Sequence, residues 1–329
     1  MLAAGVCKGN LQTPRVSRSP GSCHIVVVDA GGEEPMSAVL AGLSIAVVGG
    51  DRRTEYYLPS LMRAGAKILA VGLVRLPNHL DVTHVDLMTG IRECHAAVLP
   101  MAGMDAEGRV QNYYGDAPVM LDRSLSAVGL LVITGVIRPK LRELGTTNGW
   151  RVYEAGADDE LAYLNSVPTA EGAVRMAQER AVKTIHGSRA LVVGYGRCGT
   201  TLAALLKGMG AHVTVAARQS GTLAKAFSAG HAPLSCCDLP RVLGSYDFLF
   251  NTVPALVFTE ELLTCMRRDS VLIDIAAAAG GVDYQAARKL GRVAVLAPSL
   301  PGKFTPETAG HILGRVLPRM IIENLPEER

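Results

Sequence analysis

Aromatic side chains, net charge and long apolar runs are all scarce in this sequence. Only 5% of the 329 residues are aromatic, and 33 basic against 30 acidic side chains leave a formal charge of +3. No block of basic residues marks a nucleic-acid-binding tail. Charge, glycine or proline interrupts every apolar run before the roughly 18 residues that a membrane span needs. We therefore expect neither nucleic acid nor a membrane as a partner.

The cysteines are odd in number and lack the spacing of a metal site. No C-x-x-C pair and no Cys/His ligand pattern is present. We expect reduced cytosolic thiols, with neither a disulfide framework nor a bound metal. The seven residues are Cys7, Cys23, Cys94, Cys198, Cys236, Cys237 and Cys265.

Residues 1–40 combine proline, serine and glycine with one short apolar run at 25–28. They lack the apolar core of a secretory signal, so we expect a disordered leader. Met36 directly precedes the first strong strand-helix pattern. We therefore expect the natural chain to start there.

The rest of the chain repeats one plan. Residues 43–50 (LSIAVVGG) and 189–196 (RALVVGYG) are both apolar runs that end in glycines, as is typical of the first strand of a parallel sheet. Residues 64–68 and 209–213 match at the same offset of 145 positions (194 minus 49, and 210 minus 65). Two related β-α-β units are predicted.

Further apolar runs alternate with segments of helical length, which indicates parallel sheets covered by helices on both faces. They occupy 96–99, 130–134, 248–253, 271–275 and 293–296. The predicted class is α/β, with two Rossmann-like, doubly wound parallel-sheet domains. The predicted division is a leader at 1–40, a substrate or catalytic domain at 41–166, an interdomain helix at 167–186, a cofactor domain at 187–304 and a C-terminal helix at 305–329.

Two helices are expected to join the domains. The helix over 167–186 shows an apolar stripe, with Ser166 or Thr169 as its cap and Pro168 in its first turn. The last helix is expected to start near Thr305, whose hydroxyl is a candidate cap, and to pack back on the first domain.

A glycine motif predicts dinucleotide binding in the second domain. The pattern G-x-G-x-x-G lies between a strand and a helix, where its glycines permit a tight turn, approach of a pyrophosphate and close helix packing. A glycine turn that only serves packing is the alternative. The residues are Gly194, Tyr195, Gly196, Arg197, Cys198 and Gly199.

The end of the next strand favours NADP over NAD. An acid usually accepts from the ribose there, whereas this chain has Arg218 and Ser220, which suit a 2′-phosphate. Arg218 as a solvated loop charge is the alternative. Asp274 lies at another strand end, where a direct role toward the ligand and a buried structural role are equally suited to it. Strand-end residues expected to line the dinucleotide are Asn251, Thr252, Val253, Pro254 and Ala276.

The first domain has a glycine turn without the full motif. Gly49 and Gly50 are followed by Asp51, Arg52 and Arg53. We expect no second dinucleotide here. Arg52 and Arg53 are candidates to bind a substrate carboxylate, because guanidinium groups and a helix start both favour an anion. Solvated arginines or an interdomain ion pair are the alternatives.

Several motifs together resemble the family of dipicolinate synthase A subunits. They are residues 165–172 (NSVPTAEG), 194–199, 251–255 (NTVPA), 301–303 (PGK) and 306–310 (PETAG), within a resemblance that covers roughly residues 40–325. The resemblance implies a cytoplasmic enzyme of the mother cell of a sporulating bacterium. It implies oxidation of 4-hydroxy-tetrahydrodipicolinate, a lysine-pathway dicarboxylate, to dipicolinate with reduction of NADP, alongside a flavoprotein-like B subunit.

The resemblance also suggests roles near the expected cleft. Glu171, expected in the first turn of the interdomain helix, is a candidate for proton transfer, and a helix-start acid is the alternative. Lys303, expected in a glycine turn, is a candidate for carboxylate binding or proton transfer, and a surface lysine is the alternative. His186, expected at a helix end, and His311 are not assigned catalytic roles. Candidates to orient substrate or nicotinamide are Asn165, Ser166 and Thr169.

Two other functions stay open from the residues alone. One is a different NADP-dependent dehydrogenase of the same architecture, of the 2-hydroxyacid, alanine or adenosylhomocysteine type. The other is a scaffold protein that binds the dinucleotide without turnover. Alanine-rich helices also leave room for a homodimer interface.

Overall fold

The computed structural model describes residues 38–276 and 280–326. Most of the predicted leader, including Met36, lies outside the described residues. Within the described part, no helix has the length and apolar character to cross a membrane. The same part of the chain holds no cluster of His, Cys, Asp and Glu suited to a metal ion.

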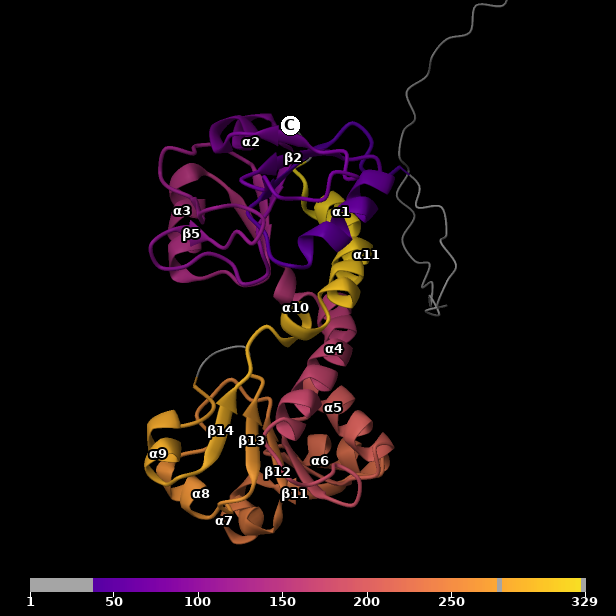
Figure 1. Cartoon of the computed structure of the whole chain (residues 1–329), viewed down its shortest axis with the longest axis vertical. Helices are drawn as coiled ribbons and strands as arrows, with labels where there is room; N and C mark the ends of the chain where they lie inside the picture. Colours follow the sequence, from indigo (N-terminus) through magenta and orange to yellow (C-terminus); the bar gives the residue numbers. More distant parts are fainter. Residues whose placement is uncertain (1–37, 277–279, 327–329) are drawn as a thin grey trace, which may run out of the picture. The chain divides into compact units, whose positions relative to one another are not determined.

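Two six-stranded parallel sheets form the framework (Figure 1). Their orders are β3-β2-β1-β4-β7-β8 and β11-β10-β9-β12-β13-β14. Numbered within each half, both orders read 3-2-1-4-5-6, the Rossmann arrangement. The first sheet comprises β1 (Ser44–Val48), β2 (Lys67–Val71), β3 (Thr83–Val85), β4 (Ala96–Val98), β7 (Leu131–Thr134) and β8 (Arg151–Glu154). The second comprises β9 (Arg189–Val193), β10 (His212–Ala217), β11 (Ala232–Ser235), β12 (Phe248–Asn251), β13 (Val271–Asp274) and β14 (Val293–Leu296). The predicted fold class is confirmed.

The internal repeat extends to strand register. Ser44 pairs with Lys67 between β1 and β2, and Arg189 pairs with His212 between β9 and β10. Both partners of the second pair lie 145 positions after those of the first (189 minus 44, and 212 minus 67). A short antiparallel hairpin of β5 (Arg109–Val110) and β6 (Val119–Met120) interrupts the plan of the first half.

Apolar side chains cover both faces of each sheet. Along β1, Ile45 and Val47 join one buried cluster, and Ala46 and Val48 join another. This alternation explains why the strands are apolar throughout. The covering helices are α1 (Thr54–Arg63), α2 (Leu87–Glu93), α3 (Pro139–Asn148), α5 (Arg197–Gly208), α6 (Ser220–Ser228), α7 (Leu239–Val242), α8 (Glu260–Thr264) and α9 (Tyr284–Lys289).

The C-terminal helix α11 (Pro306–Asn324) packs against α1 in the first half (Figure 1). Leu313 and Leu317 are buried in the same cluster as Leu58 of α1. A Cβ on Gly310 would lie 2.4 Å from Tyr56 Cβ, so glycine permits this close approach. The predicted return of the last helix is confirmed. Its predicted cap is wrong, because Thr305 Oγ1 donates to the Pro301 carbonyl instead.

The interdomain helix α4 (Asp159–Gln178) begins and ends eight residues before its predicted bounds of 167–186. Asp158 caps it by accepting from the Leu161 amide at 2.9 Å. Pro168 therefore lies inside the helix rather than in its first turn. Leu161 is buried in a core of the first half and Ala173 in a core of the second, so α4 contributes to both.

Candidate functional site

Packing within the second glycine loop requires two of its glycines. Gly194 follows β9 with φ of 93°, and a Cβ there would lie 2.3 Å from Thr252 Oγ1. Thr252 Oγ1 itself donates to the Val193 carbonyl at 3.0 Å. A Cβ on Gly199 would lie 2.4 Å from the Gly194 carbonyl oxygen. These two positions bring α5 close to the strand end.

Gly196 is different, because the chain leaves space beside it. No described atom outside its own neighbourhood lies within 4 Å of the position that its Cβ would take. Gly196 is also the N-cap of the 12-residue helix α5, and no side chain caps that helix. Helix starts offer backbone N–H donors and a positive dipole end to anions. The loop therefore fits the pyrophosphate that its motif predicts.

Side chains at the other motif positions are engaged within the protein. The buried Tyr195 ring meets the edge of His231, with the ring centroids 5.8 Å apart. Arg197 forms an ion pair of 2.8 Å with Asp159 of α4. Burial raises the pKa of the Cys198 thiol, although the charge of Arg197 opposes this. Backbone groups are thus the main ligand surface that the loop offers.

The ends of β12 and β13 form a buried hydrogen-bonded group. Asn251 Nδ2 donates to Asp274 Oδ1 at 2.9 Å, and Tyr284 Oη donates to Asp274 Oδ2 at 2.8 Å. The Ala276 amide donates to Asp274 Oδ1, and the Val253 amide to Asn251 Oδ1. Burial raises the pKa of Tyr284, and the hydrogen bond to Asp274 raises it further. Asn251 and Asp274 therefore support the strand ends through these bonds, and contact of Asn251 with the dinucleotide stays a prediction.

Beyond the glycine loop, three predicted cofactor residues are exposed: Arg218, Ser220 and Pro254. Arg218 directly follows β10, and Ser220 begins α6. Within the part of the chain that the structure describes, Arg218 has no ion-pair partner. Its charge lowers the pKa of Cys236, although burial of that thiol raises the pKa more. A cation is thus present at the strand end where the ribose of a dinucleotide is expected.

In the first half, the chain itself occupies the glycine turn. The Gly50 amide donates to the Gln111 carbonyl at 2.9 Å, and the Tyr113 amide donates to the Gly50 carbonyl at 2.8 Å. A Cβ on Gly49 would lie 2.6 Å from the Gln111 carbonyl oxygen. This arrangement provides a physical basis for expecting no second dinucleotide, which stays a prediction.

Arg53 is committed to Asp51. Its Nε donates to Asp51 Oδ1 at 2.9 Å and its Nη2 to Asp51 Oδ2 at 2.5 Å, and the arginine is 6% exposed. Burial raises the pKa of the Asp51 carboxyl, but the bonds and charge of Arg53 outweigh burial and leave the pKa below its ordinary value. Arg53 also lines the hollow described next, but a carboxylate of the chain already occupies its guanidinium, so its role in binding a substrate carboxylate stays a prediction.

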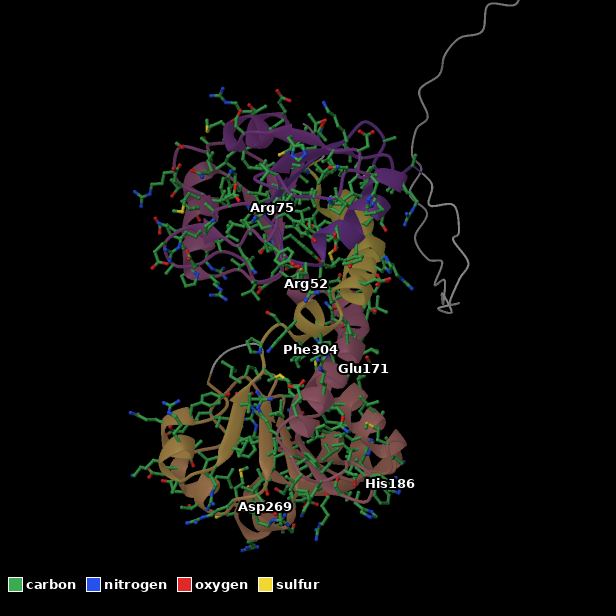
Figure 2. The ribbon with its side chains drawn as sticks, in the orientation of Figure 1. Arg52, Arg75, Glu171, His186, Asp269 and Phe304 are labelled. Carbon is green, nitrogen blue, oxygen red and sulfur yellow. The ribbon has the colours of Figure 1, made fainter. Side chains whose placement is uncertain are left out.

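Arg52 and Lys303 share a hollow of about 290 Å³. Arg52 Nη1 donates to the Lys303 carbonyl at 3.5 Å, and Figure 2 shows Arg52 beside the short helix α10 (Leu300–Phe304). Lys303 therefore lies in a helix rather than in the predicted glycine turn, and its Nζ lies 5.1 Å from the Phe304 ring centroid. Gln111 and Ser299 also line the hollow.

Ser299 has an unusual backbone conformation for its residue type. Its φ is 55°, and among the described residues other than glycine it alone has positive φ. It connects the end of β14 to α10. Non-glycine residues in this region carry strain that gathers at functional sites. Ser299 thus supports a functional assignment of the hollow.

Comparisons with known proteins place these features in a family. The model of the N-terminal domain of the dipicolinate synthase A subunit matches residues 44–155, and that of the D-isomer specific 2-hydroxyacid dehydrogenase NAD-binding domain matches residues 162–287. The dipicolinate synthase A subunit of Bacillus subtilis is 31% identical over 296 residues, which cover 88% of this chain and 99% of that protein. The chain belongs to the family of dipicolinate synthase A subunits.

Solved structures agree with this membership. The crystal structure of the dipicolinate synthase A subunit from Bacillus halodurans has a TM-score of 0.82 and 32% identity, covering 86% of this chain and 98% of that one. The Bacillus subtilis structure has a TM-score of 0.81 and 31% identity, covering 88% and 99%. An L-alanine dehydrogenase, at 16% identity and a TM-score of 0.60 over 84% and 89% of the chains, shows the shared fold alone.

Part of the family motif at residues 165–172 forms hydrogen bonds within and beside α4. Ser166 Oγ lies 2.6 Å from both the Tyr163 carbonyl oxygen and Thr201 Oγ1, and Thr169 Oγ1 donates to the Asn165 carbonyl at 2.6 Å. Ser166 and Thr169 are not caps, because the helix starts at Asp159. Asn165 Oδ1 is buried without a hydrogen-bond partner among the described residues, which keeps Asn165 a candidate for ligand contact.

Two further expectations about position are corrected. Glu171 is exposed in the middle of α4 rather than in its first turn, and it does not line the Arg52–Lys303 hollow. His186 lies beyond the end of α4 at Gln178, so it does not end a helix. His311 meets the ring of Tyr56 edge to face, with the centroids 6.1 Å apart.

Sequence reasoning missed Gln111, Tyr113 and Ser299 as lining residues. Gln111 and Tyr113 belong to the segment after β5, which no motif marked. Tertiary pairing with Gly50 brings that segment to the site. The one available signal for Ser299 was its place between an apolar strand and Pro301.

Proposed function

We propose that this chain is the NADP-dependent oxidoreductase component of dipicolinate synthase and works in the mother cell of a sporulating bacterium. The observation that carries the proposal is the cationic hollow of Arg52 and Lys303, which the segment following β14 also lines. A crevice beyond the carboxyl ends of the strands is where ligands bind in this fold. The name of the B. subtilis relative marks it as an A subunit, which supports a B subunit as the partner of this chain.

The substrate we propose is 4-hydroxy-tetrahydrodipicolinate. Loss of water gives a dihydropyridine dicarboxylate, and removal of one hydride and one proton then gives aromatic pyridine-2,6-dicarboxylate. NADP, when bound, supplies the hydride acceptor. Gly196 and the uncapped start of α5 would hold its pyrophosphate, and Arg218 and Ser220 its 2′-phosphate.

The substrate's negative charge matches the hollow. We assign Arg52 and Lys303 to one carboxylate, because a guanidinium and an ammonium both bind carboxylates through charge-assisted hydrogen bonds. Lys303 is also our candidate for proton transfer. Glu171 is exposed in the middle of α4 and does not line the hollow, so we assign no step to it.

A coupled assay tests the proposal. Freshly generated 4-hydroxy-tetrahydrodipicolinate and NADP are added to the full chain, with and without a candidate B subunit. Formation of NADPH and dipicolinate is followed by ultraviolet absorbance, and equal growth of the two products is the expected result. NADP binding without either product in both preparations would contradict the proposal and favour the scaffold function. NADPH formation from another hydroxy or amino acid alone would favour a different dehydrogenase.

A further inference from the structure

A second hollow, of about 200 Å³, adjoins the one that Arg52 and Lys303 line. The two share Ala102 and Gln111. The second hollow is also lined by Arg138, which precedes α3, and by Asp105 and Arg109 near the β5–β6 hairpin. The shared residues make the two hollows neighbours along one surface.

The acids that line these hollows are already neutralised. Asp51, in the first hollow, is bound by Arg53. Asp105, in the second, forms an ion pair of 2.7 Å with Arg109. Each acid thus uses one cation of its own hollow. Neither carboxylate remains to neutralise a further arginine or lysine.

Three cationic side chains that line the hollows have no ion-pair partner among the described residues. Arg52 and Lys303 in the first hollow and Arg138 in the second form no ion pair within residues 38–276 and 280–326. Arg138 is exposed, so its charge stays hydrated and carries little desolvation cost. It nevertheless gives the second hollow a positive charge without an internal partner. The positive charge is therefore divided between two places rather than gathered at one.

Gln111 lies where the hollows meet and its backbone is firmly held. Its carbonyl accepts from the Gly50 amide. The next residue, Asn112, donates through Nδ2 to the Gly72 carbonyl at 2.9 Å and to the Ala117 carbonyl at 3.0 Å. These bonds fix the segment through which Gln111 lines both hollows.

We propose that the two hollows form one site for a rigid ligand with two carboxylates. Arg52 and Lys303 bind one carboxylate, Arg138 binds the other, and the Gln111 amide faces the ring between them. The inference rests on the proposed function, because it takes the first hollow as the substrate site. It assigns Arg138 as the residue that distinguishes dicarboxylates from monocarboxylates, since a monocarboxylate leaves one cationic end unfilled.

Calorimetric binding to the full chain with NADP tests this assignment. The probes are pyridine-2,6-dicarboxylate against pyridine-2-carboxylate, and benzene-1,3-dicarboxylate against benzoate. We expect Arg138→Gln to weaken both diacids about 10- to 100-fold, as loss of a charge-assisted contact predicts, with little effect on the monoacids. Arg52→Gln should weaken all four. Arg142→Gln is the matched control, because Arg142 is exposed on α3 and lines neither hollow.

The outcomes separate this inference from the proposed function. Wild-type protein that binds diacids no better than monoacids, or a preference that survives Arg138→Gln, would overturn the two-carboxylate site. Turnover of the dicarboxylate precursor in the same preparation would leave the proposed function intact in either case. Arg138-dependent binding of benzene-1,3-dicarboxylate, without turnover of the dicarboxylate precursor either with or without the candidate B subunit, would support the site and contradict the function.

Discussion

Arg319 of α11 donates to Asp158 Oδ2 at 2.8 Å, while Asp158 Oδ1 accepts from the Leu161 amide at 2.9 Å and caps α4. One carboxylate therefore caps the interdomain helix and joins it to the C-terminal helix. Burial raises the pKa of Asp158, but the bonds from Arg319 and the Leu161 amide outweigh it and lower the pKa below its ordinary value of 3.8. This bond is a local source of stability.

Replacement of Asp158 by alanine should destabilise the fold. Loss of the cap alone costs about 1 kcal/mol, and Arg319 also loses its partner. We expect a lower urea midpoint with an unchanged slope. Asp159→Ala is the control, because its carboxylate is 82% exposed and does not cap the helix. Equal losses in the two variants would contradict the role of Asp158.

The lowered pKa of Asp158 predicts an acid-dependent loss of stability. Its contribution is complete above the ordinary value of 3.8 and is lost as the pH falls through the lower folded value. Urea midpoints measured from neutral pH to about pH 3 should therefore fall less steeply for Asp158→Asn than for the wild type. Parallel pH profiles of the two proteins would exclude the carboxylate as a contributor.

Gly196→Val should weaken dinucleotide binding by about 100-fold or more, because the added side chain fills the space that the pyrophosphate needs. Gly208→Val is a close control. Gly208 ends the same helix, and its Cβ position is equally open. Fluorescence titration of both variants with NADP checks the result, and equal affinities would argue against the loop as the cofactor site.

Arg218→Asp should reverse cofactor preference. We expect about a 10-fold or greater loss of NADP affinity with NAD affinity kept, because the substitution removes a partner for the 2′-phosphate and adds a like charge. Arg241→Asp is the control, since Arg241 is an exposed arginine paired with Asp238. An unchanged ratio of the two affinities would show that Arg218 is a solvated loop charge.

Two substitutions distinguish a substrate-binding role of Lys303 from a role in proton transfer. Lys303→Met removes the charge and should raise KM by about 10-fold or more. Lys303→Arg keeps a charge that does not titrate near neutral pH, so it should preserve KM. A fall in kcat with Lys303→Arg, with a changed pH profile, would support proton transfer. Unchanged KM in both variants would exclude Lys303 from substrate binding.

The strands and the glycine loop were predictable because their signals are local. Apolar runs ending in glycine recur 145 positions apart (189 minus 44), and the same offset appears in strand register. Helix starts were harder. Ser166, Pro168 and Thr169 together resemble a helix start, yet Asp158 supplies the real cap eight residues earlier, and tertiary packing carries the helix through Pro168.

In both halves of the candidate site, some features follow from local sequence patterns and others from the folded structure. Local patterns in the sequence were enough to predict two Rossmann sheets, the glycine loop with Gly196, and cations at 52, 53 and 303. Only the folded structure shows that Asp51 neutralises Arg53, two residues away, and that the distant Gln111 segment enters the first glycine turn. Periodicity and turn chemistry act within a few residues, whereas cavity shape depends on segments far apart in the chain. A local ion pair such as Asp51–Arg53 depends on side-chain conformations that the residue pattern does not specify.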